Sequence, residues 1–393
     1  MSLSSDLERE VHLQEADVKS FADLRSEVIE PGLCGKCGGC TSFCSAGGLQ
    51  ALGLDHDGYP QYIDEARCLK CGICYLICPV TRDLATEVRA RFGWKPPLGV
   101  YQTIVSARAT DESILSVATD GGVVTSLLLR MLERHVIDGA IVSRRTGIFS
   151  REPLVATTPE EIITAAGSQF SGTAHLEQLG QQYTTYSPTI SAVKDLEGRR
   201  LHRIALVGTP CQVSTVRKMQ CLHIIPADVI THTIGLFCVE NLTFEAPAAE
   251  RLMERWGVHL EEVVKLNIKD DLIFTVGDGR MVHVPLTEVE ELARPACLAC
   301  TEFANAYADI SVGGLGSPDG YTTTLIRTDK GRQAYNDALR HGCIEERTFR
   351  DLGERRSEKT KMLAKVMAFA RLKKERGTAR RRELGLNGGE SSE

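Results

Sequence analysis

Eight of the fourteen cysteines in this chain of 393 residues fall into two runs of identical spacing. Each run separates its cysteines by two, two and three residues, and Pro79 follows the second run. The runs are Cys34, Cys37, Cys40 and Cys44, and then Cys68, Cys71, Cys74 and Cys78. Two-residue gaps let three thiolates converge on one 4Fe–4S cubane, while the fourth cysteine crosses over to the other cluster. The spacing therefore predicts two 4Fe–4S clusters and an electron-transfer function.

Disulfide bonds and zinc sites are the alternative uses of closely spaced cysteines. Paired zinc sites need two cysteine pairs for each metal, which tandem quartets do not provide. The first residues, Met1 to Glu10, contain no basic end followed by an apolar stretch, so we do not expect export. Many cysteines without export indicate a reducing compartment, where disulfides are rare. We therefore expect a cytoplasmic protein with an N-terminal domain of the bacterial-type ferredoxin class.

Four cysteines further along the chain could hold a third cluster. Cys211 and Cys238 each end a run of apolar residues that predicts a strand. Cys297 and Cys300 form a Cys-x2-Cys pair. Open α/β folds gather functional groups at strand ends, but buried cysteines are also common as packing residues. The spacing alone leaves both interpretations open.

Two glycine runs are candidates for contact with a bound cofactor. Residues 120–125 precede a helical pattern, so their backbone amides could face an anionic group such as a pyrophosphate. Residues 313–320 follow a strand pattern and would allow a backbone loop to approach a ring system closely. Neither run matches the Gly-x-Gly-x-x-Gly pattern of a dinucleotide-binding unit. Taken singly, each run could equally form a tight turn.

The patterns after residue 98 predict an α/β fold with a parallel or mixed sheet. Apolar runs that are typical of strands buried on both faces alternate with amphipathic helical patterns. The predicted strands are Tyr101–Ala107, Gly139–Ser143, Ile204–Val207, Val229–Phe237 and Asp309–Gly313. The clearest helical patterns are Val123–His135 and Glu245–Trp256.

Composition and chain-breaking residues divide the sequence into four parts. Residues 1–30 form a polar N-terminal extension with helical patterning, which we expect to cover the next domain or a neighbour. Residues 31–93 form the predicted two-cluster ferredoxin domain, and the consecutive prolines at 96 and 97 end it. Residues 98–355 form the α/β body, and residues 356–393 form a basic C-terminal helix and a tail.

The basic segment between Lys359 and Arg382 has ten Lys or Arg residues and one acidic residue. An apolar stripe at helical spacing runs through it, at Met362, Leu363, Val366, Met367 and Ala370. Such a helix can bind a membrane surface or nucleic acid, but we expect it to pack on the parent domain or on a partner subunit. The net charge of −6 supplies no general basic field for nucleic acid. No apolar run reaches the ~18 residues that span a bilayer.

The stretch from about Tyr101 to Arg376 resembles the beta subunit of coenzyme F420-reducing hydrogenase and its relatives. The relatives include beta subunits of F420-dependent formate dehydrogenases, the input subunit of the membrane F420 dehydrogenase complex, and plant hydroxymethyl-chlorophyll reductase. The segments that carry the resemblance are Ile104–Thr110, Asp120–Thr125, Pro210–Gln212, Gly235–Asn241, Cys297–Cys300 and Gly316–Gly320. They occur in the order found in the family. The additional ferredoxin domain resembles the arrangement in the membrane-complex input subunit.

The resemblance implies one FAD and one 4Fe–4S cluster in the α/β body. It assigns this cluster to Cys211, Cys238, Cys297 and Cys300. It places FAD against the two glycine runs, at Asp120, Gly121, Gly122, Thr125, Gly313, Gly316, Ser317, Pro318 and Asp319. It also implies coenzyme F420 as the substrate and a hetero-oligomer with redox partner subunits of the hydrogenase, dehydrogenase or heterodisulfide-reductase type.

One stretch departs from the family pattern. The hydrogenase subunit carries Gly-Thr-Lys-Tyr ahead of a segment that contains Ser-Pro, whereas this chain has Gly167-Ser-Gln-Phe170 and, further on, Gln182 to Pro188. In either alignment, glutamine stands where the family has lysine. If that lysine helps to hold an anionic cofactor, the identity of the two-electron substrate is open.

Clusters pass single electrons, a deazaflavin accepts hydride, and FAD can do both. We therefore expect an iron–sulfur flavoprotein that passes electrons between a partner's iron–sulfur chain and FAD and exchanges hydride with F420. One alternative is a ferredoxin-dependent flavin reductase of another conjugated ring. The other is a cluster-bearing electron adapter without enzymatic activity. The sequence singles out no catalytic acid or base, and hydride transfer does not require one.

Overall fold

The computed structural model describes residues 18–145, 151–167, 182–184, 189–196, 198–245, 250, 253–259 and 262–386. Residues 1–17 of the predicted extension, Gln169 of the family departure and the tail after residue 386 lie outside these ranges. Much of the predicted helix Glu245–Trp256 also lies outside them. Its predicted start is wrong, because Glu245 ends the strand β9 (Thr243–Glu245).

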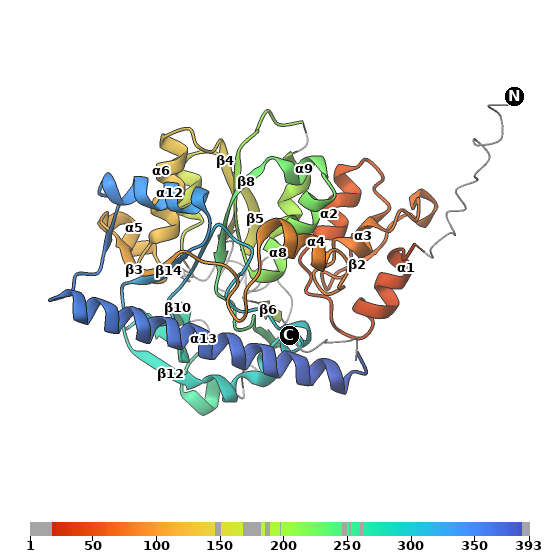
Figure 1. Ribbon diagram of the computed structural model, residues 1–393. Coiled ribbons are helices and arrows are strands. Elements are labelled where there is room, and N and C mark those ends of the chain that lie inside the picture. Colours follow the sequence, from red (N-terminus) through yellow and green to blue (C-terminus); the bar gives the residue numbers. More distant parts are fainter. Residues whose placement is uncertain are drawn as a thin grey trace, which may run out of the picture.

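Within the described residues, eight strands form one mixed sheet in the order β15-β3-β14-β13-β8-β7-β4-β5 (Figure 1). The inner strands β13, β8, β7 and β4 are parallel to one another, and the outer strands join them antiparallel. The bounds are β3 (Thr103–Ala109), β4 (Gly139–Arg145), β5 (Arg151–Ala156), β7 (Ile204–Gly208), β8 (Ile230–Leu236), β13 (Ile310–Gly313), β14 (Thr322–Ile326) and β15 (Ile344–Glu346). The α/β class, the mixed sheet and the five predicted strands are confirmed.

Alternate residues of the central strands face two separate apolar cores. Ala140 and Val142 of β4 pack with α6 (Val123–Glu133) and α12 (Asp329–Arg340) on one face. Ile141 packs with α8 (Pro210–Cys221) on the other face. Side chains alternate across a strand, so a strand that is covered on both faces needs apolar residues throughout. The shorter helices of the body are α5 (Glu112–Val117), α7 (Pro159–Thr164), α9 (Ile225–Asp228), α11 (Pro295–Leu298) and a 3-10 helix (Thr189–Leu196).

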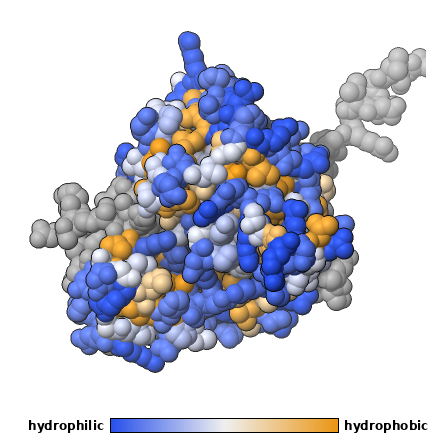
Figure 2. All heavy atoms as spheres, turned by 90° about the vertical axis from the view of Figure 1, so that its left-hand side faces the viewer, coloured by the Kyte–Doolittle hydropathy of each residue, from blue (hydrophilic) through white to orange (hydrophobic). Residues whose placement is uncertain are grey.

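The outward surfaces of the covering helices are polar. Helix α12 buries Gly331, Tyr335 and Ala338 and exposes polar residues between them. Figure 2 views the side of the molecule that carries α5 and α12, and shows a mainly hydrophilic surface with smaller apolar groups. This distribution is typical of amphipathic helices that cover a sheet.

A smaller antiparallel sheet, which the sequence analysis did not predict, lies beneath the large sheet in Figure 1. It consists of β10 (Val263–Ile268), β11 (Asp271–Val276) and β12 (Met281–Pro285). Leu272, Phe274 and Val284 are fully buried in a core of its own. Strand β9 pairs elsewhere, with β6 (Gln182–Thr184).

The cysteine runs fold as a lobe beside the α/β body (Figure 1, right). The two runs have the same backbone conformation, since Lys36 and Lys70 both have φ of 51°. In both runs a left-handed glycine, Gly38 or Gly72, precedes a helix. The elements of the lobe are α2 (Gly39–Ala46), β1 (Leu52–Leu54), β2 (Pro60–Tyr62), α3 (Ile73–Leu76) and α4 (Ala85–Phe92).

The described part of the N-terminal extension belongs to the core of this lobe. Helix α1 (Phe21–Leu24) and a π-helical turn (Arg25–Ile29) pack Phe21, Leu24 and Val28 against the cysteines. These three side chains are at most 3% exposed. The segment therefore covers the cysteines. The predicted domain boundary at residue 30 falls inside a single apolar core, so residues on both sides of it belong to the lobe.

Polar contacts along α8 hold the lobe against the body. Lys218 donates from Nζ to the carbonyl oxygens of Cys78 and Thr81. Burial lowers the pKa of Lys218 to about 8. Arg91 of α4 donates to the carbonyl oxygen of Gln220 at 2.5 Å. These contacts give the lobe a defined position relative to the body.

The basic segment forms a single long helix, α13 (Leu352–Glu383), which begins before the predicted boundary at residue 356. Met362, Val366 and Ala370 are buried and pack in one core with Phe303 and Leu315 of the body. Of the two expected surfaces, the parent domain and a partner subunit, the apolar stripe packs on the parent domain. In Figure 1, α13 crosses the lower side of the body and reaches toward the lobe.

Gly377 lets α13 approach the backbone of Cys300. A Cβ at this position would lie 2.4 Å from the Cys300 carbonyl oxygen. Replacing glycine by alanine inside a helix normally gains about 0.5–1 kcal/mol. We expect Gly377→Ala instead to lower the free energy of unfolding by about 1–3 kcal/mol, because a close-packed contact would be overfilled.

Thermal unfolding of G377A and of A379G tests this prediction. Ala379 is exposed on the same helix, so A379G measures the ordinary cost of a helical glycine. A G377A protein at least as stable as the unmodified chain would contradict the close approach.

Candidate cofactor pocket and cysteine groups

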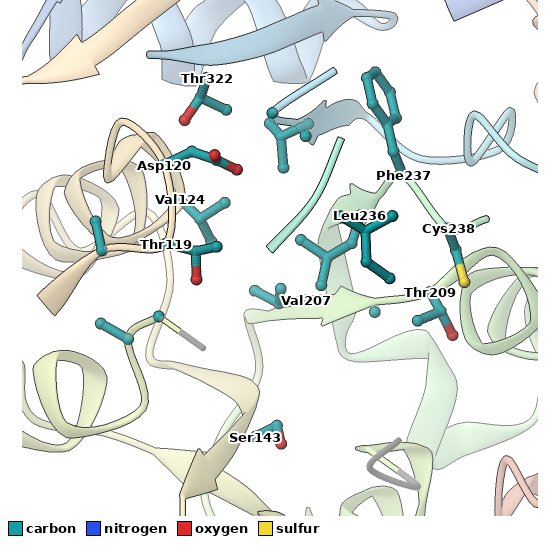
Figure 3. Close-up of a pocket in the computed structure, with 18 of the residues that line it drawn as sticks. Thr119, Asp120, Val124, Ser143, Val207, Thr209, Leu236, Phe237, Cys238 and Thr322 are labelled. Atoms are coloured by element: carbon teal, nitrogen blue, oxygen red, sulfur yellow. The ribbon is translucent and has the colours of Figure 1, made fainter. Parts of the chain in front are cut away.

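A pocket of about 410 Å³ opens at the carboxyl ends of the parallel strands. Val207 of β7, Leu236 of β8 and Gly313 of β13 lie in its wall. The loop before α6 and the end of β10 form further walls (Figure 3). Open α/β sheets bind ligands at this edge, and the volume lies in the usual range for cofactor sites.

The loop before α6 is fixed to the edge of the sheet. The Gly121 N–H donates to Thr322 Oγ1 at 2.9 Å, and the Gly121 carbonyl accepts from the Ala109 N–H at 2.6 Å. Gly122 has φ of 69° and leads into α6, whose first turn has no side-chain cap among the described residues. Asp120 and Gly122 of this loop and Thr125 of α6 line the pocket, whereas Gly121 is outside its lining. The first turn of α6 therefore lies at the pocket wall, and helix N-termini of this kind are the usual anion-binding ends.

The second glycine run faces the pocket only at its beginning. Gly313 and Gly314 line the pocket, but Ser317 turns away and hydrogen-bonds Ser106 at 2.8 Å. A Cβ at Gly316 would meet Met362 of α13. Asp319 is on the surface, with its side chain 92% exposed. Of the FAD contacts expected in this run, the structure brings Gly313 to the pocket and leaves Gly316 to Asp319 outside its lining.

Asp120 is the acidic side chain of the pocket wall nearest to α6 (Figure 3). Burial raises the pKa of its carboxyl group, against the lowering effect of Lys269 and Lys265. Lys269 Nζ lies 3.9 Å from Asp120 Oδ1 and 2.7 Å from Asp319 Oδ1. Lys269 also lines the pocket, so the pocket contains a cation that the sequence analysis did not identify.

The first three cysteines of the first run gather with the last cysteine of the second run. Burial raises the pKa of the Cys40 thiol well above its usual value, and the nearby thiols of Cys37, Cys34 and Cys78 raise it further. Burial also raises the pKa of Cys78 to about 11, with Cys37 as the next cause. We call these four residues the inner lobe group.

The remaining four cysteines of the lobe form a second group. Burial raises the pKa of Cys74 to about 12, and the thiols of Cys71, Cys68 and Cys44 raise it further. Cys71 is exposed at the surface. Cys74 also contributes to the raised pKa of Cys40, so the two groups adjoin. We call these four residues the outer lobe group.

The four cysteines of the body also lie together, as the body group. Cys211 lies in the first turn of α8, and Cys238 follows β8. Burial raises the pKa of Cys238 well above its usual value, and Cys297, Cys211 and Cys300 raise it further. Asn241 joins two of them: its backbone N–H donates to Cys297 Sγ and its side-chain amide to Cys238 Sγ, each at 3.5 Å.

The inner lobe group lies next to the body group, and the body group next to the pocket. Thr215 Oγ1 is 3.7 Å from Cys37 Sγ and donates to the Cys211 carbonyl at 2.9 Å. Burial raises the pKa of Cys211 to about 12, and Cys37 is the next cause. Cys238 lines the pocket on the side opposite Asp120 (Figure 3). The three groups and the pocket therefore follow one another in space.

All fourteen cysteines are free thiols, so the disulfide alternative is not realised. Across the described ranges, no three His, Cys, Asp or Glu side chains are arranged as ligands of a single metal ion. A 4Fe–4S cube takes one thiolate at each iron, so its ligands surround the cube rather than converge on one atom. The cysteine groups, with four thiols each, are therefore candidates for clusters.

Comparison with known proteins places this fold and site in a class of oxidoreductase subunits. Residues 104–181 match the N-terminal model, and residues 201–351 the C-terminal model, of the coenzyme F420 hydrogenase/dehydrogenase beta subunit. The coenzyme F420 hydrogenase subunit beta of Methanococcus voltae is 33% identical over 299 residues, which cover 74% of this chain and 98% of that subunit. The chain belongs to the family of coenzyme F420 hydrogenase/dehydrogenase beta subunits.

Two other relatives match a larger share of the chain. A subunit of the F(420)H(2) dehydrogenase of Methanosarcina mazei is 27% identical, over 80% of this chain and 84% of that subunit. The coenzyme F420-dependent sulfite reductase of Methanocaldococcus jannaschii is 29% identical, over 79% of this chain and 47% of that enzyme. A chain of the F420-reducing [NiFe] hydrogenase complex from Methanosarcina barkeri superimposes with a TM-score of 0.61 at 31% identity, over 74% of this chain and 94% of that one.

Among the described residues, no helix is both long and apolar enough to cross a bilayer, including the long helix α13.

Proposed function

We propose that this protein is an iron–sulfur flavoprotein subunit that passes electrons between a partner's iron–sulfur chain and FAD, and exchanges hydride with coenzyme F420. The main observation behind this proposal is the position of Cys238, which belongs to the body group and also lines the pocket. A cluster on the body group would therefore adjoin a ligand in the pocket. The likeness to F420 hydrogenase beta subunits supports F420 as the substrate.

The residues of the cysteine groups fit clusters. A buried thiol with a raised pKa keeps its proton until a metal binds the sulfur and displaces that proton. Several sulfur atoms also accept N–H hydrogen bonds, which tune iron–sulfur clusters. These donors are the backbone N–H groups of Lys36 to Cys34, Ala51 to Cys44 and Asn241 to Cys297.

The pocket fits a flavin nucleotide. The amides of the first turn of α6 and the Lys269 ammonium would hold the anionic part of the cofactor. Gly313 and Gly314 allow the side chains of Phe237 and Asp120 to lie against the backbone of the pocket wall, because a Cβ at either glycine would clash with them. Val207, Leu236 and Phe237 line the wall between these parts and exclude water from the ring.

Bound FAD would supply the conversion between one-electron and hydride transfer. The chain's own residues position the reactants: Thr215 and Asn241 hold the body group, and the loop 119–122 and Lys269 orient the ligand in the pocket. No side chain is assigned a proton transfer, because hydride exchange requires none.

The proposal is tested with the anaerobically purified full chain. It should contain FAD and about twelve iron atoms, the content of three 4Fe–4S clusters, and should reduce F420 with a low-potential artificial donor. Full iron and flavin without F420 turnover would defeat the proposal. Reduction of a different conjugated ring, with none of F420, would instead support the alternative substrate that the Gln169 departure raises.

A further inference from the structure

Lys373 is a buried cation beside the body group. Its side chain belongs to α13, and the residue is 3% exposed. Nζ donates to the carbonyl oxygens of Val239 and Cys297, the latter at 2.8 Å. Among the described residues it forms no ion pair, and both of its hydrogen-bond acceptors are neutral carbonyl groups. An ammonium taken out of water without an anion carries a large desolvation cost.

The other charged residues on this part of α13 do not share that condition. Arg376 pairs with the buried carboxylate of Glu240 at 2.6 Å. Lys374 is exposed to solvent. On this part of α13, Lys373 is therefore the buried cation that has no anionic partner among the described protein groups.

The anion that fits is a cluster on the body group. Four thiolates outweigh the positive charge of a 4Fe–4S core, so such a cluster is an anion, and reduction adds one more negative charge. Burial raises the pKa of the Cys238 and Cys297 thiols. The positive charge of Lys373 lowers the pKa of Cys238, and the charges of Arg294 and Lys373 together lower that of Cys297. The ammonium is thus close enough to act on the charge of the sulfur ligands.

Given the proposed function, on which this step rests, we infer that Lys373 supplies the positive charge that balances the body-group cluster. We also infer that this charge raises the reduction potential of the cluster. A fixed buried cation stabilises the reduced cluster more than the oxidised one, because net charge and burial set cluster potentials. The contacts of α13 place this cation at the cluster nearest the pocket. The outer lobe group has no equivalent among the described residues, since the nearby Lys19 is 47% exposed and paired with Glu27. The inner lobe group has a comparable cation, because Lys218 is buried and donates to the carbonyl oxygen of Cys78.

The test is an EPR-monitored redox titration of the full anaerobic chain and two charge-removing variants. Lys373→Met should lower the midpoint potential of the body-group cluster. Lys374→Met removes the same charge from the exposed side of the same helix and should leave the potential unchanged. An unshifted potential in K373M, or an equal shift in K374M, would overturn the inference.

Lys373→Arg keeps the charge and covers the case in which K373M loses the cluster. If K373M lacks this cluster, K373R should retain its iron and keep the potential near that of the unmodified chain. A folded K373R protein without the cluster would overturn the inference. Failure of the proposed function is distinguishable, because the unmodified chain itself would then lack a third cluster signal.

Discussion

Replacing Cys238 by alanine is expected to stop electron transfer between the lobe and the pocket while FAD stays bound. The thiol belongs to the body group and to the pocket wall. Loss of one ligand should release the third cluster, so iron should fall from about twelve to about eight atoms per chain. F420 reduction by electrons that enter through the lobe should fall to background. Iron analysis, the flavin absorbance and the F420 assay measure the three effects.

Cys343→Ala is the matched control for this change. Cys343 is a partly buried cysteine that packs against the core of the body and belongs to none of the three groups. It should keep full iron and activity. A C238A protein with the iron and turnover of C343A would show that Cys238 neither holds a cluster nor lies on the electron path.

Replacing Gly121 by alanine is expected to remove FAD while the clusters stay. A Cβ on Gly121 would lie 2.7 Å from the Ala107 carbonyl oxygen and 2.8 Å from the Thr322 backbone nitrogen. Backbone atoms lie on both sides of this Cβ, and they cannot move aside as a flexible side chain could. The loop that leads into α6 must therefore move, and its amides must leave the pocket wall. We expect at least a tenfold loss of FAD affinity, equal to about 1.4 kcal/mol, and a similar loss of stability from overpacking, about 1–3 kcal/mol.

Gly277→Ala is the control for Gly121→Ala. A Cβ on Gly277 would meet its nearest neighbours at an ordinary 3.7 Å. Flavin fluorescence after release from the protein, measured with iron content, separates the two cofactors. A G121A protein with unchanged FAD content would show that the loop does not form the flavin site.

The cysteine spacing could predict the lobe groups because gaps of two and three residues fix the relative position of the thiols within each run. Lys36 and Lys70 share one backbone angle, and each run contains a left-handed glycine followed by a helix. The buried strands were equally predictable, since a strand covered on both faces must be apolar at nearly every position.

Residues whose role depends on tertiary placement could not be predicted. Lys269 follows β10 in a polar turn, and only the docking of the small sheet brings it to the pocket. In the sequence, Lys373 cannot be told apart from the other cations of a basic helix. In the structure, the contact of Gly377 with Cys300 determines which face of α13 is buried, and Lys373 lies on that face. Ser317 is the opposite case, a residue that the sequence placed at the cofactor and the structure does not. Its hydroxyl hydrogen-bonds Ser106 instead of facing the pocket.

A single-turnover reaction tests most directly the claim that the clusters and the pocket form one electron path to F420. The chain is fully reduced, freed of reductant and mixed anaerobically with excess oxidised F420. Three clusters and one FAD store about five electrons, so about two molecules of F420 should be reduced per chain while the clusters become oxidised. Reduction of one F420 or none, by protein with complete iron and flavin whose clusters stay reduced, would contradict the account.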